Sequence, residues 1–330
     1  MKTFLKIGLS LLVIVALAAG AGTAYVYARY PAVPPAESLT IHATPETLAR
    51  GQYLFEHVSL CVDCHSTRDW SKYGAPVLPG TIGKGGDLYG TNIGLPGDFY
   101  ARNITPAGLG EWTDGEIVRA VTTGVDRDGE PLFPIMPYPR YGRMAKDDVE
   151  AIVAYLRTIP AISNTVPAHT FNFPMQFVTR TIPAPAQFST RPAPDDTVKY
   201  GEYVTNAAAC TDCHTPQVQG ASVPGMDFAG GMEFPLPAGG YVRSANITAD
   251  AGTGIGTWTE QQFVDKFTAL AAAPDQVLTA PEDRKNNTVM PWKAYGGMTR
   301  EDLAAIYAYL RSLPPVVHRV EKHGDTPQAP

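Results

Sequence analysis

One five-residue pattern, Cys-x-x-Cys-His, occurs twice in this chain of 330 residues, at positions 61–65 and 210–214. The two copies lie 149 residues apart, and other short strings recur in nearly the same register. These pairs are Asn103-Ile104-Thr105 with Asn246-Ile247-Thr248, Trp112-Thr113 with Trp258-Thr259, Met136-Pro137 with Met290-Pro291, and the strings at 151–160 and 305–314. A period this long exceeds the roughly 20–50 residues of a solenoid repeat, so the sequence predicts two complete domains in tandem.

The repeat and the positions of the prolines divide the chain into segments. We expect a signal-anchor or transmembrane helix at 1–30, a proline-rich stalk at 31–45, a first domain at 46–160, a proline-rich linker strap at 161–196, a second domain at 197–314 and a C-terminal tail at 315–330. The strap contains Phe171, Phe173, Phe177 and Phe188. Because exposed phenylalanine side chains are unfavourable in water, we expect the strap to lie against one or both domains.

The segment Ile7–Tyr27 carries no charged residue over 21 positions, and Lys2 and Lys6 precede it. A secretory signal needs about 7–15 apolar residues and a membrane span about 20, so the length favours a retained anchor. The lysines place its N-terminus in the cytoplasm and the rest of the chain outside. The string Ala19-Gly20-Ala21 leaves a cleaved signal peptide as the alternative. Either interpretation exports the two domains.

Each domain is predicted to end with an amphipathic helix. In the second domain the apolar positions fall at i, i+3, i+4 and i+7, namely Leu303, Ile306, Tyr307 and Leu310. Thr299 and Asp302 resemble a capping box in front of this helix, whereas the matching cap position in the first domain is Ala145. Alanine cannot cap a helix with its side chain, so the helix start in the first domain should be weaker by about 1 kcal/mol.

Each domain is also predicted to open with a helix, at 46–57 and at 196–207. Gly51 and Gly201 interrupt these helices, at a cost of about 1 kcal/mol each. A residue without Cβ allows another helix to approach closely, so we expect a crossing at both glycines. The candidates for the crossing partner are the aromatic residues Tyr155 and Tyr309 on the last helices.

On a helical turn, the two cysteines of Cys-x-x-Cys-His share a face, and the histidine lies beside them. Two thioether bonds then hold a porphyrin while the imidazole points at its iron, which makes this pattern the attachment signature of c-type haem. We therefore expect two covalently bound haem c groups, attached to Cys61, Cys64, Cys210 and Cys213, with His65 and His214 as proximal iron ligands.

Three other interpretations of the cysteines are weaker. Zinc knuckles leave both histidines unexplained. A redox-active Cys-x-x-Cys pair needs the strand–helix context of a thioredoxin, whereas a helical pattern leads into both pairs here. Two disulfides within the pairs leave the repeat without a reason.

Methionine is the expected sixth ligand of each iron, as in many electron carriers. Met136 and Met290 each precede a proline, which holds the preceding residue extended and suits a side chain presented from a stiff loop. The alternative is that both methionines fill gaps in the core. Met144 and Met298 precede the predicted caps and have a packing role. No histidine outside the two motifs has a counterpart in the other domain, which disfavours bis-histidine ligation. Four histidines lie outside the two domains, and we expect their side chains to be solvated: His42, His169, His318 and His323.

The repeated Asn-Ile-Thr strings and the two tryptophans have two interpretations of equal weight. Haem propionates need hydrogen-bond donors when buried, which Asn103, Asn246 and the indole N–H groups can supply, with Arg102 or Arg243 adding charge. The other interpretation is a turn followed by a core tryptophan. The glycine-rich segments 74–97 and 220–240 predict turns and short hairpins at the haem edge.

Composition excludes several functions. The chain has 26 basic against 32 acidic residues, which argues against a nucleic-acid-binding protein and against a polybasic membrane-surface protein. Its 31 glycines and 30 prolines indicate many ordered loops. Four cysteines are too few for a disulfide scaffold in a chain of this length.

The Cys-x-x-Cys-His and Met-Pro motifs, with the string DLAAIYAYLRSLPPV that ends the second domain, resemble class I c-type cytochromes over residues 46–314. The whole is most similar to membrane-bound cytochrome c subunits of bacterial periplasmic dehydrogenases for alcohols, aldehydes or gluconate. The resemblance implies a mainly α fold of two tandem, loop-rich cytochrome c domains after one transmembrane helix. One departure matters: the alcohol and gluconate subunits usually carry three haem motifs, and this chain has two. Dihaem subunits of haem–copper oxidases are a second relative.

The sequence therefore predicts a dihaem cytochrome c of the bacterial inner membrane, with both haem domains in the periplasm, that relays single electrons. The resemblance implies a dehydrogenase subunit as donor and a quinone, an oxidase or a soluble cytochrome as acceptor. The alternatives are a dihaem peroxidase or oxidase, which needs an iron with an open sixth position, or a dihaem subunit of a terminal oxidase. A methionine bound to each iron favours the carrier over the enzyme.

Overall fold

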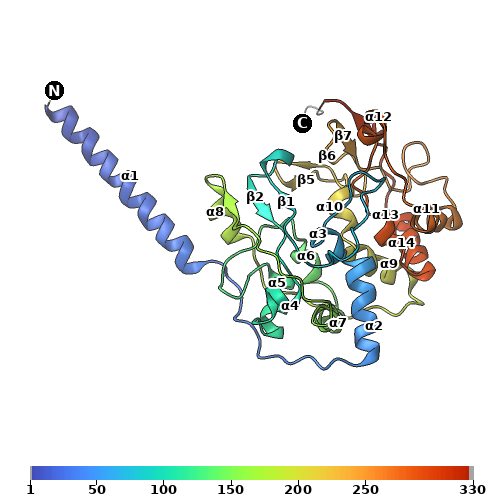
Figure 1. Ribbon diagram of the computed structural model, residues 1–330. Coiled ribbons are helices and arrows are strands. Elements are labelled where there is room, and N and C mark those ends of the chain that lie inside the picture. Colours follow the sequence, from blue (N-terminus) through green and yellow to red (C-terminus); the bar gives the residue numbers. More distant parts are fainter. Residues whose placement is uncertain (1, 327–330) are drawn as a thin grey trace.

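The computed structural model of the protein describes residues 2–326. Helix α1 (Lys2–Arg29) projects away from the folded body, as Figure 1 shows. An 18-residue stretch within Thr3–Arg29 has a mean hydropathy of 2.3 and is not buried against the rest of the chain. The length and composition of α1 suit either a membrane span or a signal sequence.

The first repeated unit is mainly helical, with one short hairpin. Its helical elements are α2 (Pro45–Tyr53), the π-helical turn η1 (Leu54–Val58), α3 (Cys61–Cys64), the 3-10 turn η2 (Thr91–Ile93), α4 (Pro106–Leu109), α5 (Asp114–Thr123), α6 (Tyr138–Tyr141) and α7 (Lys146–Leu156). Strands β1 (Leu88–Tyr89) and β2 (Gly97–Tyr100) pair antiparallel, with Leu88 opposite Tyr100. The hairpin lies in the glycine-rich segment, as predicted.

The second unit repeats this plan. Its helices are α9 (Thr197–Ala207), α10 (Cys210–His214), α11 (Glu260–Ala272), α12 (Pro281–Lys285), α13 (Trp292–Tyr295) and α14 (Arg300–Ser312). Its strands are β4 (Gln217–Val218), β5 (Ala221–Ser222), β6 (Glu233–Pro235) and β7 (Tyr241–Arg243), which form two antiparallel hairpins. The C-terminal tail adds β8 (His323–Gly324) to the edge of β7.

The linker strap joins the units and contains β3 (Thr170–Phe171), α8 (Met175–Val178) and the 3-10 turn η3 (Thr179–Thr181). Strand β3 pairs with β2, which attaches the strap to the first unit. Phe171 packs edge-on against Phe99, with ring centroids 5.2 Å apart. Among the four phenylalanines of the strap, Phe173 is the exception to the predicted burial, because its side chain is 81% exposed.

The predicted crossing of first and last helices is confirmed in both units. A Cβ at Gly51 in α2 would lie 1.9 Å from the carbonyl oxygen of Ala151 in α7 and 2.9 Å from Cβ of Tyr155. At the matching crossing of α9 and α14, a Cβ at Gly201 would lie 1.9 Å from the carbonyl oxygen of Ala305. The helices therefore touch backbone to backbone, which explains why glycine occupies both positions.

The last helices begin as the sequence predicted, with one difference. The Thr299 hydroxyl caps α14 by accepting a bond from the Asp302 N–H at 3.1 Å, and Ala145 gives α7 no side-chain cap. The other half of the predicted capping box does not form, because the Asp302 carboxylate turns away to accept hydrogen bonds from Tyr53 and Tyr200. Complete capping boxes start α5 and α11 instead, built on Thr113 and Thr259.

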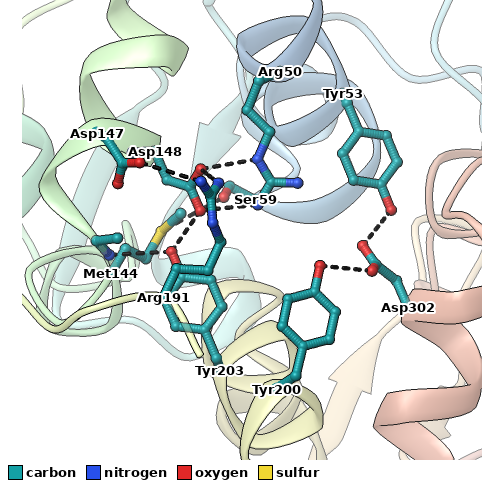
Figure 2. A network of polar contacts seen from close by, with 11 residues as sticks. Arg50, Tyr53, Ser59, Met144, Asp147, Asp148, Arg191, Tyr200, Tyr203 and Asp302 are labelled. Atoms are coloured by element: carbon teal, nitrogen blue, oxygen red, sulfur yellow. Dashed lines mark hydrogen bonds and ion pairs between the residues drawn. The ribbon is translucent and has the colours of Figure 1, made fainter. Parts of the chain in front are cut away.

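Two tyrosines join the units reciprocally (Figure 2). Tyr53 of the first unit donates a hydrogen bond to Asp302 at 2.6 Å. It also accepts one from the backbone N–H of Thr299 at 3.1 Å. Tyr203 of the second unit donates to Asp148 at 2.6 Å and accepts from the N–H of Ala145 at 3.1 Å. Each unit thus contacts the N-terminus of the other unit's last helix in the same way.

Most of the buried apolar residues of the two units belong to one continuous cluster, which includes Phe55, Met144, Val204 and Leu303. The two repeated units therefore pack as a single body around a shared core rather than as separate globules. This packing sets the position of one Cys-x-x-Cys-His motif relative to the other.

Candidate functional site

The two cysteine motifs adopt the same local structure. Each begins with a residue in the left-handed region, Leu60 at φ 50° and ψ 32° and Ala209 at φ 51° and ψ 30°. A side chain in this conformation costs about 1–2 kcal/mol relative to the right-handed region. Strained backbone of this kind concentrates at functional sites, where the surrounding structure holds it in place. Here it starts a short helical turn that carries both cysteines.

The histidines of the two motifs are held by matching hydrogen bonds. His65 Nδ1 lies 2.8 Å from the carbonyl oxygen of Arg102, and His214 Nδ1 lies 2.8 Å from that of Ala245. A carbonyl oxygen can only accept a hydrogen bond, so the proton sits on Nδ1, and Nε2 keeps its lone pair and is suited to bind a metal. Burial lowers the pKa of both imidazoles, which keeps them neutral, as a ligand must be.

A glycine from a later loop in each unit holds the backbone carbonyl of the motif histidine by a hydrogen bond. The N–H of Gly85 donates to the carbonyl of His65 at 2.8 Å, and the N–H of Gly230 donates to that of His214 at 2.7 Å. Gly85 and Gly230 have φ of 66° and 73°, and a Cβ at either would lie 2.4 Å from neighbouring backbone. Only glycine combines this conformation with this close approach.

The Met-Pro loops are tied to the cysteine motifs in both units. Short helices α6 and α13 follow these loops directly. The hydroxyl of Tyr141 in α6 donates to the Ser59 carbonyl at 2.6 Å, and that of Tyr295 in α13 donates to the Ala208 carbonyl at 2.6 Å. These two tyrosines thus hold each loop against the chain that leads into the cysteines.

Met136 and Met290, the predicted distal ligands, are half-buried and pack against the core cluster. The prolines that follow have φ and ψ of −78° and 48° in the first unit and −82° and 67° in the second, close to an inverse γ-turn. Met144 and Met298 are fully buried, which agrees with their predicted packing role. The role of Met136 and Met290 as iron ligands stays a prediction.

The other interpretations of the cysteines gain no support from the geometry. Within residues 2–326, no three His, Cys, Asp or Glu side chains are placed to hold a zinc ion together. Burial raises the pKa of Cys61 and Cys210 to about 12. A redox-active cysteine pair needs a lowered thiol pKa, because the thiolate is the nucleophile.

Some buried hydrogen-bond donors of the first unit have no partner within residues 2–326. The Nε of Arg102 and the hydroxyl of Tyr138 are buried and have no hydrogen-bond partner in the described part of the chain. Buried donors of this kind are rare, and they suit the carboxylates of a propionate-bearing group. Arg102 was predicted from the sequence to lie near a haem propionate, whereas Tyr138 was not. The signal was present, because Tyr138 and Trp292 each stand two residues after a Met-Pro methionine.

The repeated asparagines make structural contacts. The Oδ1 of Asn103 accepts bonds from the N–H and hydroxyl of Thr105, and its amide donates to the Ile162 carbonyl at 2.8 Å. Asn246 bonds Thr248 in the same way and donates to the Val316 carbonyl at 2.9 Å. These contacts tie the segment after the last helix to each unit, which favours the turn interpretation over propionate binding.

The histidines outside the motifs are less exposed than the sequence suggested. His42 is exposed, as expected, but His169, His318 and His323 are half-buried. His169 Nδ1 accepts from the Tyr100 N–H at 3.2 Å, and His318 Nδ1 lies 2.9 Å from the Ala229 carbonyl. The expectation of solvated side chains was wrong for these three because the strap and tail fold onto the units.

The two motifs approach each other across the junction of the units. Arg140 of the first unit pairs with Asp212, inside the second motif, at 2.7 Å. Asp63, at the matching place in the first motif, pairs with Arg68 at 3.1 Å. Burial raises the pKa of Cys213 to about 12, and the charge of Cys64 in the other motif adds to this effect. The Arg140–Asp212 pair joins the segment after the first Met-Pro loop directly to the second motif.

Comparison with known families places the second unit in a class. Residues 198–314 match the family described as cytochrome c. This part of the chain is therefore similar to cytochrome c domains, a mainly helical class that carries covalent haem and transfers electrons. The predicted resemblance to c-type cytochromes is confirmed.

Several curated proteins are similar to most of the chain. The cytochrome c subunit of alcohol dehydrogenase (quinone) from Komagataeibacter europaeus is 29% identical over 272 residues, covering 78% of this chain and 54% of that protein. The fructose dehydrogenase cytochrome subunit of Gluconobacter japonicus is 27% identical over 307 residues, covering 85% and 55%. A diheme cytochrome c-type protein of Cereibacter sphaeroides is 26% identical over 286 residues, covering 81% and 86%. The chain spans about half the length of the dehydrogenase subunits it matches.

Proposed function

We propose that the chain is a dihaem cytochrome c that relays single electrons. Cys61 and Cys64 attach one haem and Cys210 and Cys213 the other, in domains spanning 46–160 and 197–314. The observation that carries this proposal is the matched geometry of the two motifs. In each, a residue in the left-handed region precedes the cysteines, and Nδ1 of the histidine contacts a backbone carbonyl. In each, a tyrosine hydroxyl also links the helix after the Met-Pro loop to the chain before the cysteines.

The residues of each unit have separate tasks in this proposal. His65 and His214 present Nε2 as proximal ligands, and Met136 and Met290 are the distal ligands. Arg102 and Tyr138 supply donors to propionates in the first unit. The bound haem supplies reversible one-electron chemistry at its iron. With both axial positions filled by the chain, no position is open for a substrate, so the protein conducts electrons rather than catalysing a reaction alone.

The proposed donor is the catalytic subunit of a dehydrogenase, and the proposed acceptor is a quinone, an oxidase or a soluble cytochrome. Relatives that are cytochrome subunits of alcohol and fructose dehydrogenases support the donor. We further propose that α1 stays attached and anchors the protein in the bacterial inner membrane, with the units in the periplasm. Its unburied apolar surface and its N-terminal lysines support this topology.

The haem content of the purified full chain tests the proposal. A pyridine haemochrome assay should give two haems per chain, and the double variant Cys210→Ala, Cys213→Ala should give one. A single haem in the unmodified chain, or a colourless protein, would contradict two attachment sites.

The axial ligands are tested by spectroscopy of the oxidised and reduced protein. The unmodified chain should show a methionine–iron charge-transfer band and should not bind carbon monoxide when reduced. Met136→Ala or Met290→Ala should each remove part of the band and open one iron to carbon monoxide. Met175→Ala, which changes a methionine of the strap, is the control. Rapid carbon monoxide binding by the unmodified chain would favour the peroxidase or oxidase alternative.

A further inference from the structure

The strap exposes an apolar surface on the folded body. Phe173 is 81% exposed, Val178 43% and Ile182 37%, and all three lie in or beside α8 and η3. We call these three residues the strap patch. Phenylalanine at this exposure loses the burial that most phenylalanines gain on folding, so a cluster of such residues marks a contact surface.

The strap patch lies beside the C-terminal end of α1. Phe177 in α8 packs edge-on against Tyr27 of α1, with ring centroids 6.1 Å apart, and Phe173 continues this aromatic row at 6.2 Å. The guanidinium of Arg180 lies 4.4 Å from the centre of the Tyr27 ring, and its Nε donates to the Tyr30 carbonyl at 3.2 Å. In Figure 1, α8 stands on the side of the body that faces α1. The patch is therefore held at a defined place relative to this helix.

The length of α1 determines at which depth of a bilayer its C-terminal end, beside the strap, would lie. The uncharged run Ile7–Tyr27 covers 21 residues, and at about 1.5 Å per residue it spans about 30 Å, the thickness of the hydrocarbon core. The outer boundary of the core then falls at Tyr27, with Tyr25 and Tyr30 on either side, which is the usual level of an interfacial aromatic belt. Phe177 and Arg180, which lie next to the strap patch in the chain, contact α1 at this level.

The charges of the strap also suit a lipid surface. The sequence contains no Asp or Glu between Glu150 and Asp195, although the chain has 32 acidic residues in all. The charge of Arg180 is already paired with Glu130 at 2.6 Å. Contact of the patch with lipid therefore removes no carboxylate of the strap from water and meets no repulsion from anionic headgroups.

We propose that the strap patch inserts into the outer interface of the bilayer beside α1. This inference rests on the proposed role of α1 as a membrane anchor. A single membrane helix can still rotate and tilt in the bilayer together with the body that packs on its end, whereas a second, interfacial contact restricts this orientation. With this second contact, the same side of the two units always faces the membrane.

Lipid photo-crosslinking of the full-length holoprotein tests this contact. Phe173→Cys is labelled with a benzophenone maleimide after haem attachment and reconstituted in vesicles of phosphatidylcholine and phosphatidylglycerol. Val317→Cys is the matched control, because Val317 is 80% exposed but lies in the C-terminal tail. Ile14→Cys reports on α1. The unsubstituted chain should not be labelled, because its four cysteines are bound to haem.

We expect lipid adducts at 14 and at 173, with a severalfold higher yield at 173 than at 317. Val178→Cys, a second position in the patch, should behave like Phe173→Cys. Adducts at 14 but none above the 317 level at 173 or 178 would overturn the interfacial contact alone. No adduct at any position would overturn the anchor together with the contact, and labelling of the unsubstituted chain would overturn haem attachment. Adducts of 173 with another polypeptide instead of lipid would also contradict the proposal.

Discussion

At the scale of single residues, two helix crossings of this fold depend on a glycine, because glycine has no side chain. Gly51 and Gly201 let α2 meet α7, and α9 meet α14, so closely that a Cβ would lie 1.9 Å from a carbonyl oxygen. The crossing partner in each case is backbone, which cannot rotate out of the way. The two crossings bring the helix before each cysteine motif against the helix that ends its unit.

Gly51→Ala should therefore destabilise the folded protein. Overpacking costs about 1–3 kcal/mol, which outweighs the gain of about 1 kcal/mol in helix propensity. Thermal unfolding of the holoprotein, followed by circular dichroism, measures the change. Gly252→Ala is the control, because its nearest neighbour, Asp250 Oδ1, lies 3.7 Å away. A Gly51→Ala variant as stable as Gly252→Ala would show that the helices separate without cost.

Among the helices, the N-terminus of α7 illustrates how the units depend on each other. Its Asp148 side chain is 1% exposed and accepts hydrogen bonds from Arg50 at 2.8 and 2.9 Å, and from Tyr203 of the other unit. Burial alone would raise the pKa of this carboxyl group. The bonds to Arg50, its charge and the Tyr203 hydroxyl outweigh burial and lower the pKa below its ordinary value.

This lowered pKa predicts a pH-dependent stability. The unfolded chain binds the proton more tightly, so the contribution is complete above the unfolded pKa of about 3.9 and is lost as the pH falls through the folded pKa. Asp148→Asn should remove about 3 kcal/mol at pH 7 and flatten the acid side of the stability curve. Asp147→Asn, which affects an exposed ion pair with Arg191, should cost at most about 1 kcal/mol. Equal losses in both variants would contradict the role of Asp148.

For the molecule as a whole, the junction of the units decides how near the two cysteine motifs lie. The reciprocal tyrosines and the Arg140–Asp212 ion pair come from opposite units and hold this junction. The Arg140–Asp212 ion pair reaches into the second cysteine motif itself, so the first unit lies directly against that motif. Close motifs suit fast transfer between two haems within one chain.

Electron paramagnetic resonance tests this closeness. Two nearby ferric irons couple magnetically, and the coupling falls steeply with distance. The oxidised spectrum of the full chain should therefore differ from the sum of two single-haem variants, Cys61→Ala with Cys64→Ala and Cys210→Ala with Cys213→Ala. Circular dichroism of the variants controls for their fold. A spectrum equal to the sum would show that the irons lie too far apart for coupling.

Much of the helical fold was predictable because its signals are local. The apolar stripe of α14, the uncharged run of α1 and the interrupting glycines are patterns in short stretches of chain, and the structure confirms the elements they predict. The repeat itself also needed no structure. The haem attachment sites and axial ligands stay predictions from these same patterns, supported by the matched local geometry of the two units.

Other features depend on residues far apart in the chain, and no local pattern reveals them. Asp302 has the spacing of a capping box, yet its carboxylate bonds Tyr53, which lies 249 residues away. Tyr138 stands out only because its hydroxyl is buried without a partner, and Phe173 only because it is exposed beside α1. Propensity and hydrophobic period act over a few residues, whereas burial and pairing are settled when the two units and the strap pack together. That packing, and not the motifs, decides how the two candidate sites face each other.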